Sequence, residues 1–195
     1  MSQSTIAASS SRSAVSERYD VPTLIFHWLT VVLVVVLFAS ALTWNYVTPH
    51  DRFWRPLLED SHVSLGVLFA AVIVLRVVWR LTGMRRLRPE AGVSGVLSRI
   101  MYGLLYLLLV AQSASGFVLR WAQGEAFTFF SLFPIPALMG RDRSLAETLE
   151  QLHNYLGWAI VILAFGHAVA ALFHHYVLKD KVLDRMALHN GPDAA

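Results

Sequence analysis

Four histidines of this chain lie within long apolar stretches, where ionisable side chains are rare. His153 and His167 stand in residues 151–175, a segment with no Asp, Glu, Lys or Arg. His27 and His62 stand near the beginnings of two other apolar stretches. An ionisable group inside a membrane is costly to keep there, so such residues mark functional sites by default. Imidazole nitrogens at these positions indicate metal ligation, proton transfer or hydrogen bonding between helices.

The spacing of these histidines predicts two separate sites rather than one. His153 and His167 are 14 residues apart, which places them on one face of a helix and about 21 Å apart along its axis. That separation is too long for a single metal ion. If successive apolar segments cross the membrane in alternating directions, His62 lies at the depth of His153 and His27 at the depth of His167. We therefore expect two pairs, His62 with His153 and His27 with His167.

A cofactor that needs two imidazoles and no other side chain is haem, because the porphyrin leaves two axial positions on its iron. Zinc would need three or four protein ligands, and neither pair has a carboxylate or a thiol near it. The chain has no cysteine, which excludes thiolate metal sites, iron–sulfur clusters and covalent c-type haem attachment. The sequence thus predicts two non-covalently bound b haems. The competing interpretation is that the histidines only hydrogen-bond across helices.

Each histidine of the first pair is followed by a glycine four residues later, Gly66 after His62 and Gly157 after His153. Four residues are about one helical turn, so each glycine lies on the face of its histidine. A missing side chain there would leave room for a flat ring. The alternative interpretation is that these glycines only allow the helices to pack closely.

Arg76 is a candidate partner for a haem propionate. It follows His62 by 14 residues, so it shares that face of the helix and lies at the depth of the second pair. A buried arginine needs an anionic partner, and haem propionates are anionic. The alternative is that Arg76 extends to the cytoplasmic headgroups, as we expect of Arg80.

The remaining four histidines are weaker candidates. His174 follows His167 by seven residues, so it faces nearly the same way and could replace His167 as a ligand. We prefer His167, because its depth fits the pairing above. A contact from His174 or His175 to a quinone head stays open. His50 and His189 lie in polar segments and are expected to face solvent.

The segments that must position these residues are apolar enough to cross a bilayer. Of the 195 residues, 56% are hydrophobic and only 15% are charged, against about 25% charged in soluble domains. A spanning helix needs about 20 apolar residues, and continuous rather than alternating apolar runs favour helices over strands. We predict an all-α, integral membrane four-helix bundle with spans at approximately residues 21–45, 61–81, 100–120 and 152–177.

These spans occupy one domain, residues 19–188, and leave no room for a soluble catalytic module. Residues 1–18 are rich in Ser and Ala and lack an apolar core, so we expect a disordered tail rather than a cleaved signal peptide. Residues 189–195 form a polar C-terminal tail. Residues 121–150 are too short and too interrupted by proline to span, and we expect their aromatic side chains to lie at the outer surface of the membrane.

The distribution of basic residues predicts the orientation. Eleven of the 16 Lys and Arg residues lie on the side that holds both termini, and five lie on the other side. Because positive residues stay on the cytoplasmic side, we expect both termini to be cytoplasmic. The basic residues flank the spans instead of forming one patch, so nucleic acid is not an expected partner. Arg52, Arg55, Arg141 and Arg143 of the outer loops could steer a small anion, although we expect nearby acids to balance them.

Several short motifs occur in order along the chain: FHW at 26–28, SHVSLGVL from Ser61, RVVWRL from Arg76, the two histidines of the fourth span, and HHYVLKDKVLDRM from His174. Together they cover about residues 18–188 and resemble the bacterial cytochrome b561 family. The resemblance implies a four-helix membrane protein with two b haems bound by His27, His62, His153 and His167. It also implies electron exchange with ubiquinone and, in some members, oxidation of superoxide at the periplasmic face.

The leading interpretation is a diheme b-type cytochrome that carries electrons through the inner membrane between ubiquinone and a periplasmic donor, for which superoxide is one candidate. Two alternatives remain. A cytochrome b subunit that anchors a hydrogenase- or formate-dehydrogenase-like complex would use the same four helices. A metal or proton transporter could use the histidines as a relay, but the predicted spans hold no acidic residue.

Overall fold

The computed structural model describes residues 19–44, 46–47, 50–83, 92–179 and 183–186. The two predicted tails, residues 1–18 and 189–195, lie outside these ranges. So do His189 and most of the basic residues between the second and third spans, namely Arg85, Arg86 and Arg88.

Four long α-helices make up most of the described chain: α1 (Val21–Trp44), α2 (Trp54–Thr82), α3 (Gly92–Gln123) and α4 (Arg143–Phe173). All four are long and apolar enough to cross a membrane, which confirms the predicted fold class. Many of their Leu, Val, Ile and Phe side chains are exposed on the outside of the bundle, as expected where lipid surrounds a protein. A π-helical turn, η1 (His174–Leu178), continues α4, and a short 3₁₀ turn, η2 (Asp184–Met186), follows it.

Three of the helices begin before the apolar spans that were predicted from composition. α2 begins at Trp54 rather than near residue 61, α3 at Gly92 rather than near residue 100, and α4 at Arg143 rather than near residue 152. Apolar composition locates only the part of a helix that lies in lipid. The helix ends outside the lipid are stabilised by capping, which hydropathy does not detect.

Two aspartates bind the free N–H groups at the starts of helices, Asp51 at α2 and Asp142 at α4. The Asp51 carboxylate accepts from the backbone N–H groups of Phe53 and Trp54, at 2.9 and 2.6 Å. These hydrogen bonds stabilise the charged form and lower the pKa of Asp51. Asp142 accepts from the N–H of Leu145 at 3.0 Å at the start of α4. Both carboxylates satisfy donors that the first helical turn leaves free.

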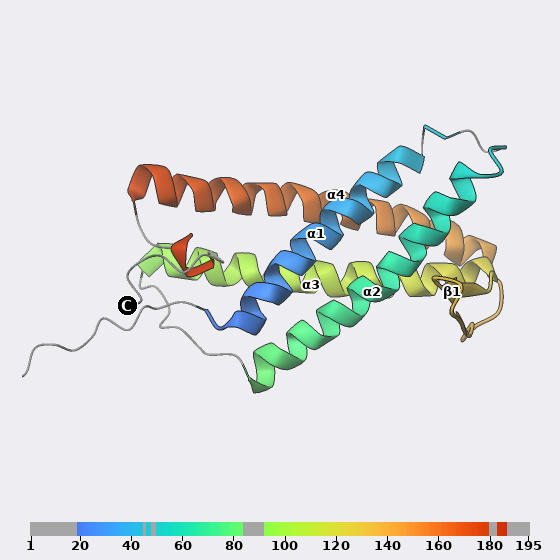
Figure 1. Ribbon diagram of the computed structural model, residues 1–195, viewed down its shortest axis with the longest axis horizontal. Helices are drawn as coiled ribbons and strands as arrows, with labels where there is room; N and C mark the ends of the chain where they lie inside the picture. Colours follow the sequence, from blue (N-terminus) through green and yellow to red (C-terminus); the bar gives the residue numbers. More distant parts are fainter. Residues whose placement is uncertain (1–18, 45, 48–49, 84–91, 180–182, 187–195) are drawn as a thin grey trace, which may run out of the picture.

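The four helices form two antiparallel pairs (Figure 1). α1 packs along α2, α3 packs along α4, and α2 joins the pairs by contacting α3. α1 reaches α4 through the rings of Phe38 and Trp158, whose centroids are 4.9 Å apart. We call the end of the bundle where α1 begins and α4 finishes the terminal end, and the opposite end, which holds β1, the hairpin end (Figure 1).

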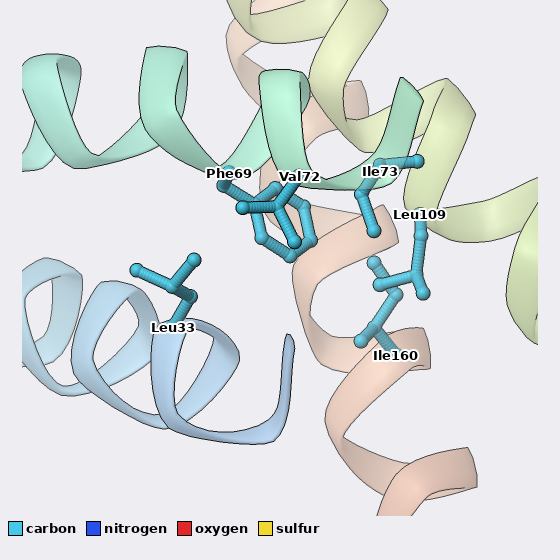
Figure 2. Packing of buried hydrophobic residues seen from close by; sticks show 6 residues of the cluster. All are labelled: Leu33, Phe69, Val72, Ile73, Leu109 and Ile160. Carbon is cyan, nitrogen blue, oxygen red and sulfur yellow. The ribbon is translucent and has the colours of Figure 1, made fainter. Parts of the chain in front are cut away.

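A layer of apolar side chains fills the middle of the bundle, between its two ends. All four helices contribute to this central layer, whose side chains point toward one another (Figure 2). Its members are Leu33, Phe69, Val72, Ile73, Leu109 and Ile160.

The segment between α3 and α4 folds into a small β-hairpin rather than a loop. Strands β1 (Phe127–Phe129) and β2 (Phe133–Ile135) pair antiparallel. Ser64 of α2 holds this hairpin: its hydroxyl accepts from the N–H of Phe130 at 3.0 Å and donates to the carbonyl of Thr128 at 3.4 Å. The hairpin is thereby held against α2 at Ser64, two residues after His62.

Asp20 connects α1 to α2 at the terminal end. Its carboxylate accepts from the Thr23 hydroxyl and from the Trp79 indole N–H, each at 2.9 Å. η2, which follows α4, lies at the same end, where the Trp28 indole donates to the carbonyl of Met186 at 3.2 Å. Hydrogen bonds therefore hold the start of α1 on two sides.

Candidate functional site

His62 of α2 and His153 of α4 face one another at the hairpin end. Their ring centroids are 6.4 Å apart and their planes are inclined by 73°. A bond between a metal and an imidazole nitrogen is about 2 Å long, so two imidazoles on opposite sides of one atom have their centres roughly 6 Å apart. The first predicted pair is thus brought together at a separation that suits one shared iron.

A cavity of about 580 Å³ adjoins these two rings. Its lining comes from all four helices and includes His62, His153, Gly66 and Gly157. A side chain added at Gly66 would meet no atom within 4 Å, and one at Gly157 would meet only the Gln112 amide, at 3.6 Å. Both glycines therefore leave open space beside the histidines, and the cavity is of a size that takes a cofactor.

Two residues that line the same cavity carry buried polar atoms without protein partners. Within the described residues, Gln112 Oε1 and Arg120 Nε are buried and make no hydrogen bond. Buried polar groups are nearly always satisfied in native proteins, so unpaired ones beside a cavity indicate a ligand with polar substituents. Gln112 also donates its amide to His153 Nε2 at 3.0 Å, and iron ligation at Nε2 would require this amide to turn aside. Two imidazoles, open glycine faces and unpaired polar atoms fit a haem.

The second predicted pair lies at the terminal end, on α1 and α4. His27 lies close enough to His167 and to Arg76 to be influenced by their charges, and His167 is likewise influenced by Arg76. The ring of His167 also lies 6.1 Å from that of Tyr102 on α3, edge to face. These contacts place His27, His167 and Arg76 in one neighbourhood.

Arg76 is held inside the bundle rather than extended to its end. It donates to the Tyr106 hydroxyl and to the Thr30 hydroxyl, each at 3.0 Å. Its guanidinium also stacks on the Tyr106 ring, with its carbon 5.2 Å from the ring centroid, and Arg80 does the same at 5.2 Å. In the described part of the chain, no carboxylate forms an ion pair with Arg76. The pocket beside this guanidinium, which Thr23 and Trp79 also line, is small, with a volume of about 10 Å³.

His174 takes part in a different local structure. α4 ends at Phe173, and His174 opens the π-helical turn that follows. The groups whose charges influence His27 are Arg76 and His167. Among the described residues, no three His, Cys, Asp or Glu side chains gather as a metal ion without a porphyrin would need.

Three arginines at the hairpin end interact with acidic or aromatic side chains. Arg143 pairs with Glu147 at 2.9 Å. Arg55 stacks on the Trp44 ring, with its guanidinium carbon 5.6 Å from the centroid. Arg120 contacts Glu59 at 2.9 Å and also pairs with a second glutamate, Glu125, at 3.0 Å.

Sequence reasoning missed several polar residues of the hairpin-end site. Gln112 and Ser115 contact His153, and Ser40 contacts His62. Each is a polar residue within an apolar span, which is the same signal that singled out the histidines. The sequence could have marked them as candidates, but not which histidine each would meet.

Comparisons with known proteins agree with this geometry. Residues 18–188 match the family described as prokaryotic cytochrome b561. The chain is 33% identical to cytochrome b561 homolog 2 of Escherichia coli over 181 residues, which cover 87% of this chain and 91% of that protein. It is 29% identical to the probable superoxide oxidase CybB of Yersinia pestis over 82% of this chain and 90% of that protein.

A more distant relative, cytochrome b561 homolog 1 of Escherichia coli, is 23% identical over 87% of this chain and 96% of that protein. The matched regions include all four helices and all four predicted histidines. The chain therefore belongs to the prokaryotic cytochrome b561 family, as a multi-pass, haem-binding electron-transport protein of the bacterial inner membrane.

Proposed function

We propose that this chain is a diheme cytochrome that carries electrons across the inner membrane and exchanges them with ubiquinone. In this proposal His62 and His153 hold the haem at the hairpin end, and His27 and His167 hold the haem at the terminal end. The observation that carries the proposal is the facing of His62 and His153 at 6.4 Å beside a cavity of about 580 Å³. The neighbourhood of His27, His167 and Arg76 supports the second site.

The side chains at each site bind and orient the cofactor. When bound, haem iron supplies a carrier that takes up and releases one electron at a time. With two histidines holding its iron, each haem would pass electrons through the edge of its macrocycle rather than bind oxygen. The residues that line the cavity then determine what can approach that edge.

The central layer separates the two proposed sites. His153 and His167 are 14 residues apart, or about 21 Å along α4, and Ile160 lies midway between them in the central layer. Apolar side chains from all four helices meet there. In this proposal an electron crosses the layer, whose apolar side chains offer a proton no hydrogen-bonding groups.

Arg76 is proposed to neutralise a propionate of the haem at the terminal end. Its contacts with Thr30 and Tyr106 hold the guanidinium between α1 and α3. The charge of Arg76 also influences His27 and His167. Extension to lipid headgroups explains these interhelical contacts less well. The propionate would supply the anion that a partly buried arginine requires.

Superoxide is the proposed donor at the hairpin end, which we propose faces the periplasm because fewer basic residues lie on that side. The name of the Yersinia relative, probable superoxide oxidase, supports this choice. Superoxide would give up one electron and leave as dioxygen. Two such electrons and two protons would convert ubiquinone to ubiquinol.

Haem content and single substitutions test the ligand assignment. The purified protein should carry two haems per chain by the pyridine haemochrome assay. His62→Ala or His153→Ala should remove one, His27→Ala or His167→Ala the other, because an axial ligand cannot be replaced by a methyl group. His174→Ala is the matched control and should keep both.

Several results would contradict the ligand assignment. A colourless wild-type protein would refute the haem assignment altogether. Loss of a haem in His174→Ala with retention in His167→Ala would refute the second pair.

The electron donor and acceptor require a kinetic test. Stopped-flow mixing of oxidised protein with superoxide should reduce both haems, and a water-soluble ubiquinone analogue should reoxidise them. Failure of superoxide with successful reduction by ubiquinol would exclude superoxide as the donor and retain the quinone reaction. Purification in mild detergent with a stoichiometric iron–sulfur partner would instead favour the anchor-subunit alternative.

A further inference from the structure

We propose that Ser40 and Ser115 are positioning residues that fix the tautomer and the ring orientation of His62 and His153. This inference rests on the proposed haem ligation and concerns what prepares the two ligands at the hairpin end. Ser40 lies on α1 beside His62 of α2, and Ser115 lies on α3 beside His153 of α4.

Both serines make the same pair of contacts. Ser40 Oγ lies 2.9 Å from His62 Nδ1 and donates to the carbonyl of Leu37 at 2.8 Å. Ser115 Oγ lies 3.0 Å from His153 Nδ1 and donates to the carbonyl of Gln112 at 2.9 Å. In each case the carbonyl belongs to the residue three positions earlier on the helix of the serine.

These contacts determine where the imidazole proton lies. A serine hydroxyl has one hydrogen to donate. In both serines a backbone carbonyl takes that hydrogen, because a carbonyl oxygen can only accept. Each serine oxygen must therefore accept from the histidine, so the Nδ1 atoms of His62 and His153 carry the proton. In a neutral imidazole the other nitrogen, Nε2, then has a free lone pair, which is the form that binds a metal.

The opposite edge of the His153 ring agrees with this assignment. The Gln112 amide nitrogen lies 3.0 Å from His153 Nε2, and an amide nitrogen can only donate, so Nε2 of His153 accepts. The tautomer of His153 is thus supported by two neighbours, Ser115 and Gln112.

The serine contacts should affect the iron as well as the rings. A hydrogen bond from Nδ1–H increases the electron donation of Nε2 and restricts rotation of the ring. The two rings are held at 73° to each other, and imidazole planes that are close to perpendicular give a strongly anisotropic low-spin ferric EPR signal. Both the potential and the EPR signal of the haem at the hairpin end should therefore depend on Ser40 and Ser115.

The experiment compares Ser40→Ala and Ser115→Ala with a matched control, Ser113→Ala, in the full-length, haem-loaded protein. Ser113 lines the same cavity and donates to the carbonyl of Leu109 at 2.9 Å, but its contacts include no imidazole. Either test variant should lower haem affinity at the hairpin end by about 10- to 100-fold. It should also raise that haem's midpoint potential and shift its EPR signal. Ser40→Thr and Ser115→Thr keep the hydroxyl and should restore the haem affinity, the midpoint potential and the EPR signal.

The haem at the terminal end serves as an internal control for folding, because it shares the chain but not the serines. Its spectrum and potential should be unchanged in every variant. If Ser40→Ala and Ser115→Ala match Ser113→Ala in affinity, potential and EPR signal, the positioning role is wrong, while two haems in the wild-type protein would leave the proposed function standing. A wild-type protein without haem would refute the proposed function itself.

Discussion

At the scale of single residues, the hairpin-end site includes two glycines that leave space beside its histidines. Gly66 and Gly157 are each one helical turn beyond a histidine, and both line the cavity. A side chain at Gly66 would project into open space within that cavity. Of the two interpretations of these glycines, room beside the histidines and close helix packing, the open space favours the first.

Gly66→Leu should therefore displace the proposed haem at the hairpin end without unfolding the bundle, because its side chain would fill space rather than strike a neighbour. The expected result is one haem per chain instead of two, measured by pyridine haemochrome, with unchanged helix content by circular dichroism. Gly103→Leu is the control: a side chain there also meets nothing within 4 Å, but Gly103 lies on the outside of α3. Two haems in both variants would contradict the assignment of the cavity.

At the scale of elements, the start of α1 is joined to the end of α2 by the Asp20 carboxylate. Burial disfavours the charge on Asp20, but hydrogen bonds from Thr23 and Trp79 outweigh it, so the pKa of Asp20 is lowered. A carboxyl with a lowered pKa stabilises the folded state above its ordinary value, about 3.9. That contribution is lost as the pH falls through the lower, folded-state value.

Asp20→Asn should thus destabilise the bundle by about 1 kcal/mol at neutral pH, the typical contribution of one hydrogen bond. The difference from wild type should shrink as the pH falls from about 5 to about 3, because wild-type Asp20 then becomes neutral too. Thermal unfolding in detergent, followed by circular dichroism across this range, measures the difference. Trp79→Phe removes one donor and should show a similar trend, whereas a difference that is equal at pH 7 and pH 3 would rule out the carboxylate.

At the scale of the whole molecule, the central layer lies midway between the two proposed haem sites. Phe69 lies seven residues after His62 and seven before Arg76, and Ile160 lies seven residues after His153 and seven before His167. Seven residues are about two helical turns, so polar, apolar and polar positions follow one another on one face of α2 and of α4. The layer both holds the four helices together and separates the proposed haems.

Phe69→Ala should test how much the central layer stabilises the bundle. Phe69 is 4% exposed, and removing a buried phenyl ring costs about 3–5 kcal/mol. The temperature at which helix content is lost in detergent should fall clearly. Val74→Ala on the same helix is the control, because Val74 is 61% exposed and its loss should change the transition little. Equal transitions in the two variants would show that the layer is not the stabilising core.

The number of helices, their approximate positions and the histidines worth examining could all be determined from the sequence. These properties can be read along the sequence, because the length of an apolar run alone decides whether it can cross a bilayer. Depth follows in the same way, since position along a helix converts to distance at a constant rise. The pairing of His62 with His153 was predicted from depth, and the structure brings these residues together. Their ligation of haem stays a prediction.

Only the tertiary structure decided which side chains meet at each depth. Contact between helices depends on their rotation about their own axes and on which helices are neighbours, and neither quantity is encoded in hydropathy. Ser40 beside His62, Ser115 beside His153, and Arg76 against Tyr106 are contacts between different helices. The β-hairpin held by Ser64 is likewise a long-range contact. The sequence by itself determined where the chemistry lies along each helix, and the packing of the helices determined which neighbours prepare it.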